Sequence, residues 1–476
     1  MMRSGAGILE GARRESLLLL VLAAYAVLLA VRLPLLVAPD TWLALVAGRE
    51  IVEHGIPTHD TLTVWSAGQP WVDQQWLAQL SIYGVVAAGG LRLALLLHVG
   101  FLVGTIAIVL LAGRRLGASP RAVAIGGALC LLGAAEAAVL RGQTLALPLF
   151  AAVLWLLVAD ARAPSNRILL ALPLLALWTN LHGSVVLAAA LVALRGLDCL
   201  RSRPRVGLLL LVGAPAALLA SPYGSSILGY YERTLGNDTF AEFVTEWAPP
   251  AFPGDWRVFV LAGAALWLVS RHSALLTRYE KLVFLVLLLA AMSANRNTVW
   301  LALFCGVVLP SLIDVEWPRT PSPSSRRLAL ATWSAVGVAL VALGFAAARQ
   351  PAWYEQRYPA QAAAVVQDIL ERDPSARVFS GEWFADWLLW KVPQAKGRIA
   401  FDVRFELLSD AQHVQLSEFT NAAEGWRRLL RGYRVVVLEP DKHARNEDAL
   451  LSSGSAHRAY VDEQISVLLL RTEETP

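Results

Sequence analysis

The sequence predicts an α-helical, multi-pass membrane protein that ends in a small α/β domain outside the cytoplasm. Of its 476 residues, 56% are hydrophobic and 16% are charged, whereas a soluble protein has about 25% charged residues. Apolar runs long enough to cross a bilayer, which takes roughly 20 residues, recur between residues 16 and 347. From residue 348 onward, helical and strand patterns alternate instead.

The positions of the basic residues predict the orientation of the chain. Cytoplasmic loops collect Lys and Arg, and three arginines precede residue 15, so we expect the N-terminus in the cytoplasm. The segment Gln75–Gly89 is short and is interrupted by polar residues and glycine, which indicates an interfacial helix and not a crossing. With this choice every later basic loop, beginning at Arg114 and Arg115, falls on the cytoplasmic side.

About eleven crossings follow from this pattern. They are predicted at residues 17–38, 91–112, 121–139, 143–160, 167–181, 183–198, 206–221, 257–270, 280–294, 297–314 and 328–347. Residues 39–90 then form an extracytoplasmic loop with two interfacial helices. An odd number of crossings places the remainder outside, so the chain divides into a membrane module, 1–347, and an extracytoplasmic domain, 348–476.

The extracytoplasmic domain is predicted to be α/β because its helix and strand signals alternate. Helices are expected at Pro359–Arg372, Glu382–Trp390 and His443–Ser452, with a further helical stretch that ends at Arg431. Strands are expected at Ala376–Ser380, Arg398–Phe401, Arg434–Leu438, His457–Val461 and Ile465–Arg471. The domain contains no glycine-rich phosphate fingerprint, which argues against a Rossmann-type nucleotide site.

The charge and the cysteine positions argue against nucleic-acid binding, a disulfide framework and a cysteine-based metal site. The net charge of +4 comes from basic residues in short loops between spans, so it reflects topology and not nucleic-acid binding. The three cysteines, Cys130, Cys199 and Cys305, fall in or beside apolar spans. They therefore predict neither a disulfide framework nor a cysteine-based metal site.

Asp40, just past the first predicted span, is the candidate catalytic residue. A carboxylate in an ordered loop at the membrane surface is where a membrane enzyme would hold a general base. The alternative is helix capping, because Asp40 precedes a stretch with helical spacing and Asp is a favoured N-cap. Thr41 could cap the helix instead, and a carboxylate at a helix start would also be held rigidly.

Further candidates lie in the same loop. Asp60 has a typical turn context, and with Asp40 it could contribute to a metal site; Asp73 precedes the predicted interfacial helix. The tryptophans Trp65, Trp71 and Trp76 predict an aromatic belt at headgroup level or, alternatively, a groove for a lipid or a sugar.

Cationic and imidazole side chains lie at the predicted outer ends of later spans. Arg141, His182 and Arg296, together with Asn180, are interpreted either as snorkelling residues or as a site for an anion such as phosphate. Arg favours phosphate because its planar guanidinium binds two oxygens at once.

Two other segments carry candidate ligand groups. Glu246 lies before a double proline in an outer loop, which is typical of an ordered turn and could form a lid; a solvated loop is the alternative. Asp402 and Arg404 follow a predicted strand, where they form either a salt-bridged turn or a ligand site.

These residues resemble the GT-C superfamily of membrane glycosyltransferases, which includes protein O-mannosyltransferases and bacterial lipid A aminoarabinose transferases. The resemblance spans nearly the whole chain. It rests on Asp40–Arg49, Gly55–Pro57, His59–Asp60, Pro70–Leu77, Trp178–Gly183, Ser221–Gly224, Glu246–Trp247 and Phe401–Arg404. One departure is that Thr41, and not a second acid, follows Asp40. The involvement of a divalent cation, Mg or Mn, therefore stays open.

The resemblance implies a polyprenyl-phosphate-linked sugar donor and an acceptor hydroxyl or amine on a glycan, lipid or protein. Asp40 would be the general base, while Arg141, His182 and Arg296 would hold the lipid phosphate. The location implied is the bacterial cytoplasmic membrane, with the reaction on its outer face. The rival functions are a transporter or flippase of lipid-linked glycans, although the two halves show no clear repeat, and a non-catalytic glycan-binding protein.

Overall fold

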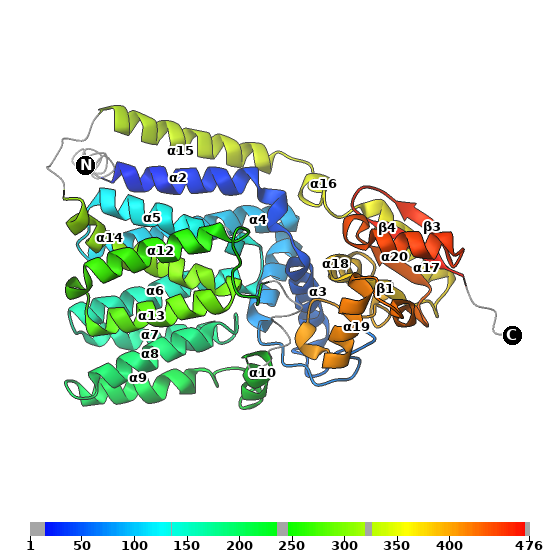
Figure 1. Cartoon of the computed structure of the whole chain (residues 1–476), viewed down its shortest axis with the longest axis horizontal. Helices are drawn as coiled ribbons and strands as arrows, with labels where there is room; N and C mark the ends of the chain where they lie inside the picture. Colours follow the sequence, from blue (N-terminus) through cyan, green and yellow to red (C-terminus); the bar gives the residue numbers. More distant parts are fainter. Residues whose placement is uncertain (1–14, 135, 236–245, 319–325, 472–476) are drawn as a thin grey trace. The chain divides into compact units, whose positions relative to one another are not determined.

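A computed structural model describes residues 15–134, 136–235, 246–318 and 326–471 (Figure 1). The arginines before residue 15, which predicted a cytoplasmic N-terminus, lie outside this part of the chain. The chain forms two compact units. Unit 1 comprises Met1–Leu33, Arg92–Ile227 and Val244–Arg349, and unit 2 comprises Pro34–Leu91, Leu228–Phe243 and Gln350–Pro476.

Unit 1 is helical, and each predicted crossing corresponds to helical structure. Its helices are α2 (Ser16–Val31), the second part of α4 (Trp76–Arg115), α5 (Pro120–Ala134), α6 (Gly142–Arg162), α7 (Ala171–Trp178), α8 (Val185–Cys199), α9 (Pro204–Ala217), α12 (Trp256–Arg271), α13 (Arg278–Ser293), α14 (Thr298–Glu316) and α15 (Arg326–Ala347). Four stretches are long and apolar enough to span a bilayer, namely Trp76–Arg115, Gly142–Arg162, Asn295–Glu316 and Arg327–Ala347. The number of crossings and their direction stay predictions.

Helix α4 breaks at the point where the sequence predicted the interfacial helix to end. Helix α4 contains a break at Gly89 and Gly90, whose backbone angles are not helical. Gly90 has φ +73°, a left-handed conformation that residues with a Cβ atom seldom adopt. The first span is shorter than predicted: α2 ends at Val31, and a 3₁₀ turn covers Leu33–Leu36. Pro34 explains this end, because it lacks an amide hydrogen and disfavours helix in the residue before it.

Small residues set the helix packing in unit 1. A Cβ atom at Gly133 of α5 would lie 2.7 Å from the Cβ of Ala302 in α14, and one at Gly126 would lie 2.8 Å from Pro310. Such close backbone approach is typical of membrane helix interfaces. Helix α14 is the central helix of unit 1, since 83% of its most apolar stretch is buried. In α15 only 11% of the corresponding stretch is buried, and this helix contacts α2 along its length (Figure 1).

A buried ion-pair network joins the ends of three helices in unit 1. Asp160 at the end of α6 accepts hydrogen bonds from Arg195 of α8, at 2.8 Å, and from Arg203 before α9, at 2.7 Å. Arg195 also contacts Asp198. Buried charges are tolerated only when they are paired in this way, so the network ties these helix ends together.

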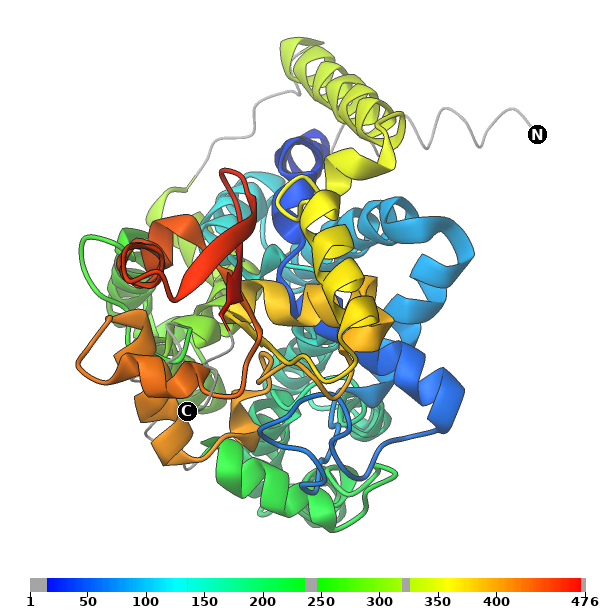
Figure 2. The ribbon, with the colours of Figure 1, turned by 90° about the vertical axis from the view of Figure 1, so that its right-hand side faces the viewer.

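Unit 2 contains the predicted α/β domain. Its helices are α3 (Pro39–His54), the first part of α4, most of α10 (Ser226–Leu235), α16 (Pro351–Tyr354), α17 (Ala360–Arg372), α18 (Glu382–Lys391), α19 (Asp410–Thr420) and α20 (Pro440–Ser452). Its strands are β1 (Val378–Ser380), β2 (Val435–Leu438), β3 (Ala456–Val461) and β4 (Ser466–Leu470), in the order β1-β2-β4-β3. Only β1 and β2 are parallel, and α17 and α20 pack against the sheet (Figure 2).

The prediction of a strand at Arg398–Phe401 is wrong. Ile399 makes isolated parallel bridges to Val378 and to Thr63, so this segment joins the first loop to the sheet without becoming a strand. The amides of Val64 and Trp65 donate to the carbonyls of residues 399 and 400, at 2.8 and 3.0 Å. The first loop is therefore an integral part of unit 2.

Trp71 is buried in unit 2, and Trp65 is half-buried against its core. The Trp65 ring stacks on Phe401 with centroids 5.1 Å apart, and its Nε1 donates to the Tyr433 hydroxyl at 2.8 Å. Trp71 is only 4% exposed. Trp76, the first residue of α4, is half-buried.

Candidate active site

Arg404 is the centre of a buried charge cluster in unit 2. Its Nη2 lies 2.8 Å from Oδ1 of Asp60 and 2.5 Å from Oδ2 of Asp402, and its Nε donates to both Asp402 oxygens at 2.9–3.0 Å. The guanidinium carbon lies 4.3 Å from the centroid of the Trp71 ring. Arg404 and Asp402 thus form the salt-bridged turn that was one of the two predicted alternatives, and they do so inside the unit.

Both carboxylate oxygens of Asp60 have hydrogen-bond partners. Besides Arg404, it accepts hydrogen bonds from the Leu62 amide at 3.0 Å, the Thr63 hydroxyl at 2.9 Å and the Ser66 hydroxyl at 2.8 Å. Burial alone would raise the pKa of Asp60, but Arg404 and these hydrogen bonds hold the pKa below its ordinary value. Asp60 therefore stabilises a turn, as the sequence predicted, and it also forms an ion pair that the sequence could not reveal.

The structure places Asp40 at the start of helix α3. It is half-buried in the first turn of α3, at the second helical position. The residue before the helix is Ala38, whose amide donates to the Thr41 hydroxyl at 3.2 Å. Asp40 is therefore not the N-cap, and a capping role does not explain its presence. A carboxylate in the first turn is nevertheless stabilised by the positive end of the helix.

Two acids near Asp40 were missed by the sequence analysis. Asp386 in α18 is completely buried; its Oδ2 accepts from the Val403 amide at 3.2 Å, and its Oδ1 has no hydrogen-bond partner among the described residues. Burial raises the pKa of Asp386 well above its ordinary value, and the charges of Asp402 and Asp40 raise it further. The second, Glu406, is half-buried. Its place in Asp402-Val-Arg404-Phe-Glu406, where charged residues alternate, could have indicated it.

Asp73 and Glu406 have pKa values near neutrality. Burial raises the pKa of Asp73 from 3.8 to about 7 against the opposing charge of Arg404, and Glu406 raises it further. Burial likewise raises the pKa of Glu406 from 4.5 to about 7, and the charges of Asp402 and Asp40 add to this. Acids with such values cluster at functional sites, because a proton can be exchanged there at physiological pH.

In unit 1, the structure brings together Arg141, Glu246 and Arg296. Nη1 of Arg141 lies 2.8 Å from both carboxylate oxygens of Glu246, and the Arg296 amide donates to the Glu246 carbonyl at 3.0 Å. The Arg296 guanidinium lies over the Trp247 ring, 4.2 Å from its centroid. Glu246 is thus a partner of the predicted anion-binding residues. Glu246 and Trp247 lie in a turn. Their predicted function as a lid stays a prediction.

His182 is held close to the same cations. Its Nδ1 lies 2.7 Å from the Ser184 hydroxyl, and it is 6% exposed in the loop between α7 and α8. Burial lowers its pKa well below the ordinary value, and the charges of Arg296 and Arg141 lower it further, so the ring is neutral. Asn180 donates to the carbonyls of Ala176 and Ala220, at 2.9 and 2.7 Å, which is a structural role.

The fold identifies the structural class. No protein-family model matches the sequence, and no characterised protein matches it in a sequence search. The structure is similar to ArnT from Cupriavidus metallidurans bound to undecaprenyl phosphate, with a TM-score of 0.53 and 15% identity over 96% of this chain and 98% of that one. The protein has the GT-C fold.

Two further solved structures match this chain. The apo form of the same ArnT matches with a TM-score of 0.52 and 14% identity over 91% of this chain and 93% of that one. An archaeal oligosaccharyltransferase, AglB from Archaeoglobus fulgidus in complex with an inhibitory peptide and dolichol-phosphate, gives a TM-score of 0.49 and 13% identity over 96% of this chain and 75% of that one. The GT-C fold makes this chain a multi-pass membrane protein.

A metal site at Asp40 and Asp60 has no ligand set in this GT-C structure. The oxygens of Asp60 are already engaged by Arg404 and by hydrogen-bond donors. Among the described residues, the group of acids and histidines close enough to share an ion is Glu50, Glu53 and His54, of which two are exposed. Glu50 is also paired with Lys396 at 2.5 Å.

The raised pKa of Asp73 predicts how unit 2 responds to pH. Because the folded state holds the Asp73 proton up to about pH 7 while the unfolded state releases it near pH 4, stability should fall as pH rises through this window. We expect Asp73→Asn to flatten the decrease in thermal midpoint between about pH 4 and about pH 7. The exposed control Asp441→Asn should keep the slope of the wild type. An unchanged slope in Asp73→Asn would contradict the assignment.

Proposed function

We propose that this protein is a glycosyltransferase that moves a sugar from a polyprenyl-phosphate carrier to an acceptor hydroxyl or amine. The observation that carries the proposal is the fold, which matches the undecaprenyl-phosphate-bound ArnT over almost the full length of both chains. Two groups of side chains are assigned to the chemistry that such a transfer requires. One is cationic and contains Arg141, Arg296 and His182; the other is acidic and contains Asp40.

In this mechanism Asp40 is the general base. Transfer is a single displacement in which the acceptor oxygen or nitrogen attacks the anomeric carbon as the bond to the carrier phosphate breaks. The acceptor must lose a proton, and Asp40 accepts it. Its place in the first turn of α3 fixes the carboxylate and stabilises its anionic form. Base catalysis of this kind contributes typically about 10²–10⁴ in rate.

The leaving group in this mechanism is polyprenyl phosphate, and Arg141 and Arg296 stabilise it. Nη1 of Arg141 already donates to both oxygens of the Glu246 carboxylate at 2.8 Å, so this guanidinium can bind an anionic group such as phosphate. A bound phosphate would take the place of Glu246. Neutral His182 can donate a hydrogen bond without adding charge. The cations compensate the charge that develops as the bond breaks.

The proposal is tested by incubating the purified protein with a labelled polyprenyl-phosphate sugar. Release of free polyprenyl phosphate together with labelled acceptor is the expected result. Movement of the intact lipid across vesicles without release would identify a flippase and overturn the proposal. Binding of glycan with neither release nor movement would identify a non-catalytic binding protein and would also overturn it.

Arg141→Gln should weaken donor binding. Losing a charge-assisted hydrogen bond to phosphate costs about 1.5–3 kcal/mol, so we expect the donor KM to rise by roughly 10- to 100-fold. Arg167→Gln, on an exposed segment of the same unit, serves as the control and should leave the donor KM within about twofold. A donor KM in Arg141→Gln equal to that of the wild type would exclude Arg141 from the phosphate site.

A further inference from the structure

Asp386 is a buried carboxyl group that the ion pairs of unit 2 do not use. It is completely buried in α18, and the described contacts of Arg404 pair that cation with Asp60 and Asp402 instead. Its Oδ2 accepts from the Val403 amide at 3.2 Å, whereas its Oδ1 has no hydrogen-bond partner in the part of the chain that the structure describes. Burying a polar atom without a partner is costly, so such an atom calls for a functional explanation.

Tyr358 joins the part of α18 around Asp386 to the start of α3. The centroid of the Tyr358 ring lies 5.0 Å from that of Trp42 in α3 and 5.8 Å from that of Trp387 in α18. Trp42 follows Asp40 by two residues, and Trp387 follows Asp386 directly. The two helices also pack against each other. The buried acid therefore lies near the end of α3 that carries Asp40.

Asp386 holds a proton under conditions in which Asp40 is ionised. Burial raises the pKa of Asp386 well above its ordinary value, and the charges of Asp402 and Asp40 raise it further against the opposing charge of Arg404. Asp40 is half-buried at the positive end of α3, which stabilises its anion. A neutral carboxylic acid can donate a hydrogen bond, which a carboxylate cannot do. The titratable and charged groups around Asp386 are Asp40 from α3, Asp402 and Arg404 from the segment before α19, and Tyr358 before α17.

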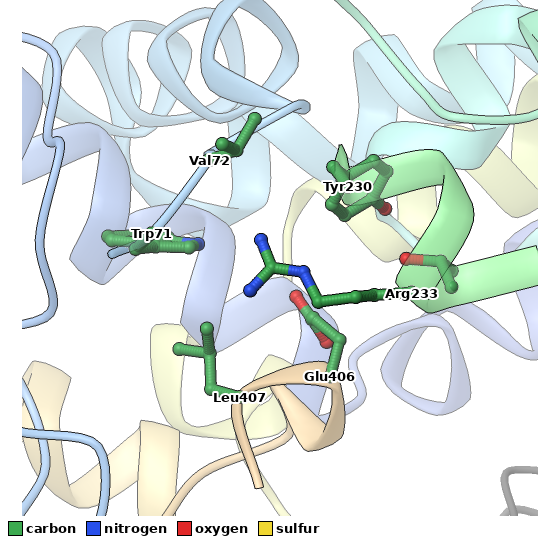
Figure 3. A pocket seen from close by; sticks show the side chains of 7 residues that line it. Trp71, Val72, Tyr230, Arg233, Glu406 and Leu407 are labelled. Atoms are coloured by element: carbon green, nitrogen blue, oxygen red, sulfur yellow. The ribbon is translucent and has the colours of Figure 1, made fainter. Parts of the chain in front are cut away.

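Glu406, the other acid on which the Asp40 charge acts, has a different environment. It lines a small pocket together with Trp71 and Arg233, and in Figure 3 the Arg233 side chain projects into the space between Trp71 and Glu406. Its surroundings therefore include a cation and a pocket. Asp386 is completely buried, so a hydrogen bond that it donates must end on a group of the protein itself.

The acceptor of that hydrogen bond can be narrowed to one carboxylate. Two carboxylates act electrostatically on Asp386, namely Asp402 and Asp40. Both oxygens of Asp402 already accept from the Arg404 guanidinium, through Nε and Nη2. Asp40 is therefore the favoured acceptor.

We propose that Asp386 is a positioning residue of the Asp40 site, which stays neutral and donates a hydrogen bond from Oδ1 to the Asp40 carboxylate. The inference rests on the proposed function, because Asp386 acts through the proposed general base. The bond fixes one oxygen of Asp40 and leaves the other to take the acceptor's proton. It also stabilises the anionic form that a base requires. Asp386 keeps its own proton throughout and does not contact the acceptor.

Infrared spectroscopy on the full-length protein in detergent tests the protonation of Asp386 without a substrate. At about pH 8, Asp73 and Glu406, with pKa values of about 7, are mostly ionised. The C=O stretch of a protonated carboxylic acid should nevertheless remain in the wild type and disappear in Asp386→Asn. The exposed control Asp368→Asn should keep the band. A band that is the same in Asp386→Asn and the wild type would show that Asp386 is ionised and would overturn the proposal.

Transfer kinetics of two substitutions separate hydrogen-bond donation from filling of space. Asn keeps a neutral donor group at position 386, whereas Leu has a similar size and no donor group. We expect Asp386→Asn to lower kcat by about threefold or less and Asp386→Leu to lower it by roughly 10-fold or more. In Asp386→Leu the acid limb of the kcat profile, which reports ionisation of the base, should move up by about one pH unit. Equal kcat values in the two variants, or an acid limb that does not move, would contradict the proposal.

A merely structural role of Asp386 predicts a different result. Asp386→Leu would then lower the thermal midpoint and the yield of folded protein, whereas kcat per folded molecule and its pH profile would match the wild type. If Asp386→Leu does not fold, Asp386→Asn still decides. A loss of kcat in Asp386→Asn as large as that in Asp40→Asn would overturn the neutral-donor role.

The two proposals fail in different ways. If the wild type releases polyprenyl phosphate but the variants at position 386 do not follow the expected order, the role of Asp386 is wrong and the proposed function stands. If the wild type never cleaves the sugar donor, the proposed transfer is wrong, and the role of Asp386 in it falls as well. The infrared band then still reports whether Asp386 is a neutral acid.

Discussion

Asp40→Asn should lower the rate of sugar transfer by about 10²–10⁴, the usual contribution of a general base. The amide keeps the size of the carboxylate but cannot accept the acceptor's proton at neutral pH. The measurement is the release of polyprenyl phosphate from a labelled donor in the presence of acceptor. We expect kcat to fall and the donor KM to change little, because the proton transfer occurs in the chemical step.

The fold should survive this change. Asp40 is not the N-cap of α3, since the Thr41 hydroxyl accepts from the amide that precedes the helix. The thermal midpoint of Asp40→Asn should therefore stay near that of the wild type. Glu53→Gln, an exposed acid in the same helix, is the matched control and should retain full activity. Full activity in Asp40→Asn itself would remove Asp40 from the mechanism.

Arg404→Gln should have the largest effect on stability. It would leave two buried carboxylates, Asp60 and Asp402, without their shared cation, and breaking a buried pair in this way costs about 3–5 kcal/mol. The expected result is a marked decrease in the thermal midpoint of unit 2, measured in detergent by the loss of near-UV circular dichroism. The ion pair of Arg372 with Asp368, which is exposed (78% and 52%), provides the comparison. Arg372→Gln should cost no more than about 1 kcal/mol.

A double variant tests the cause of the Arg404 effect. Asp402→Asn in the Arg404→Gln background removes one of the orphaned charges, so it should recover part of the lost stability. If the loss of stability arose only from the missing contact between Arg404 and Trp71, Asp402→Asn would restore none of it. A wild-type thermal midpoint in Arg404→Gln would show that the buried ion pairs are not formed.

Local patterns were sufficient for most of the architecture. Apolar runs predicted the helices of unit 1, and the short, interrupted segment Gln75–Gly89 predicted a separate helix that ends where α4 breaks. Four of the five predicted strands form the sheet. The exception, Arg398–Phe401, has a strand-like sequence, but its pairing is limited to the isolated bridges of Ile399, one to the first loop and one to β1. Whether an extended segment becomes a strand depends on neighbours that are distant in sequence.

The candidate site was predicted only in part. Asp40, Asp73, Asp402 and Arg404 were singled out as candidates because charged residues beside spans or after strands are unusual. Their partners could not be inferred, since Asp386 lies within a largely apolar stretch, Glu382–Lys391, that has no functional pattern.

The sequence by itself determined the class of protein. Hydrophobic length and the placement of positive charge are local properties, and they suffice to predict membrane helices and a separate α/β segment. Tertiary structure decided which charges share an environment. Arg404 with Asp60 is one such pair, and Asp40 with Glu406 is another. The physical reason is that burial and the distance between charges set the pKa values and the strength of ion pairs, and both arise only when segments far apart in the chain fold together.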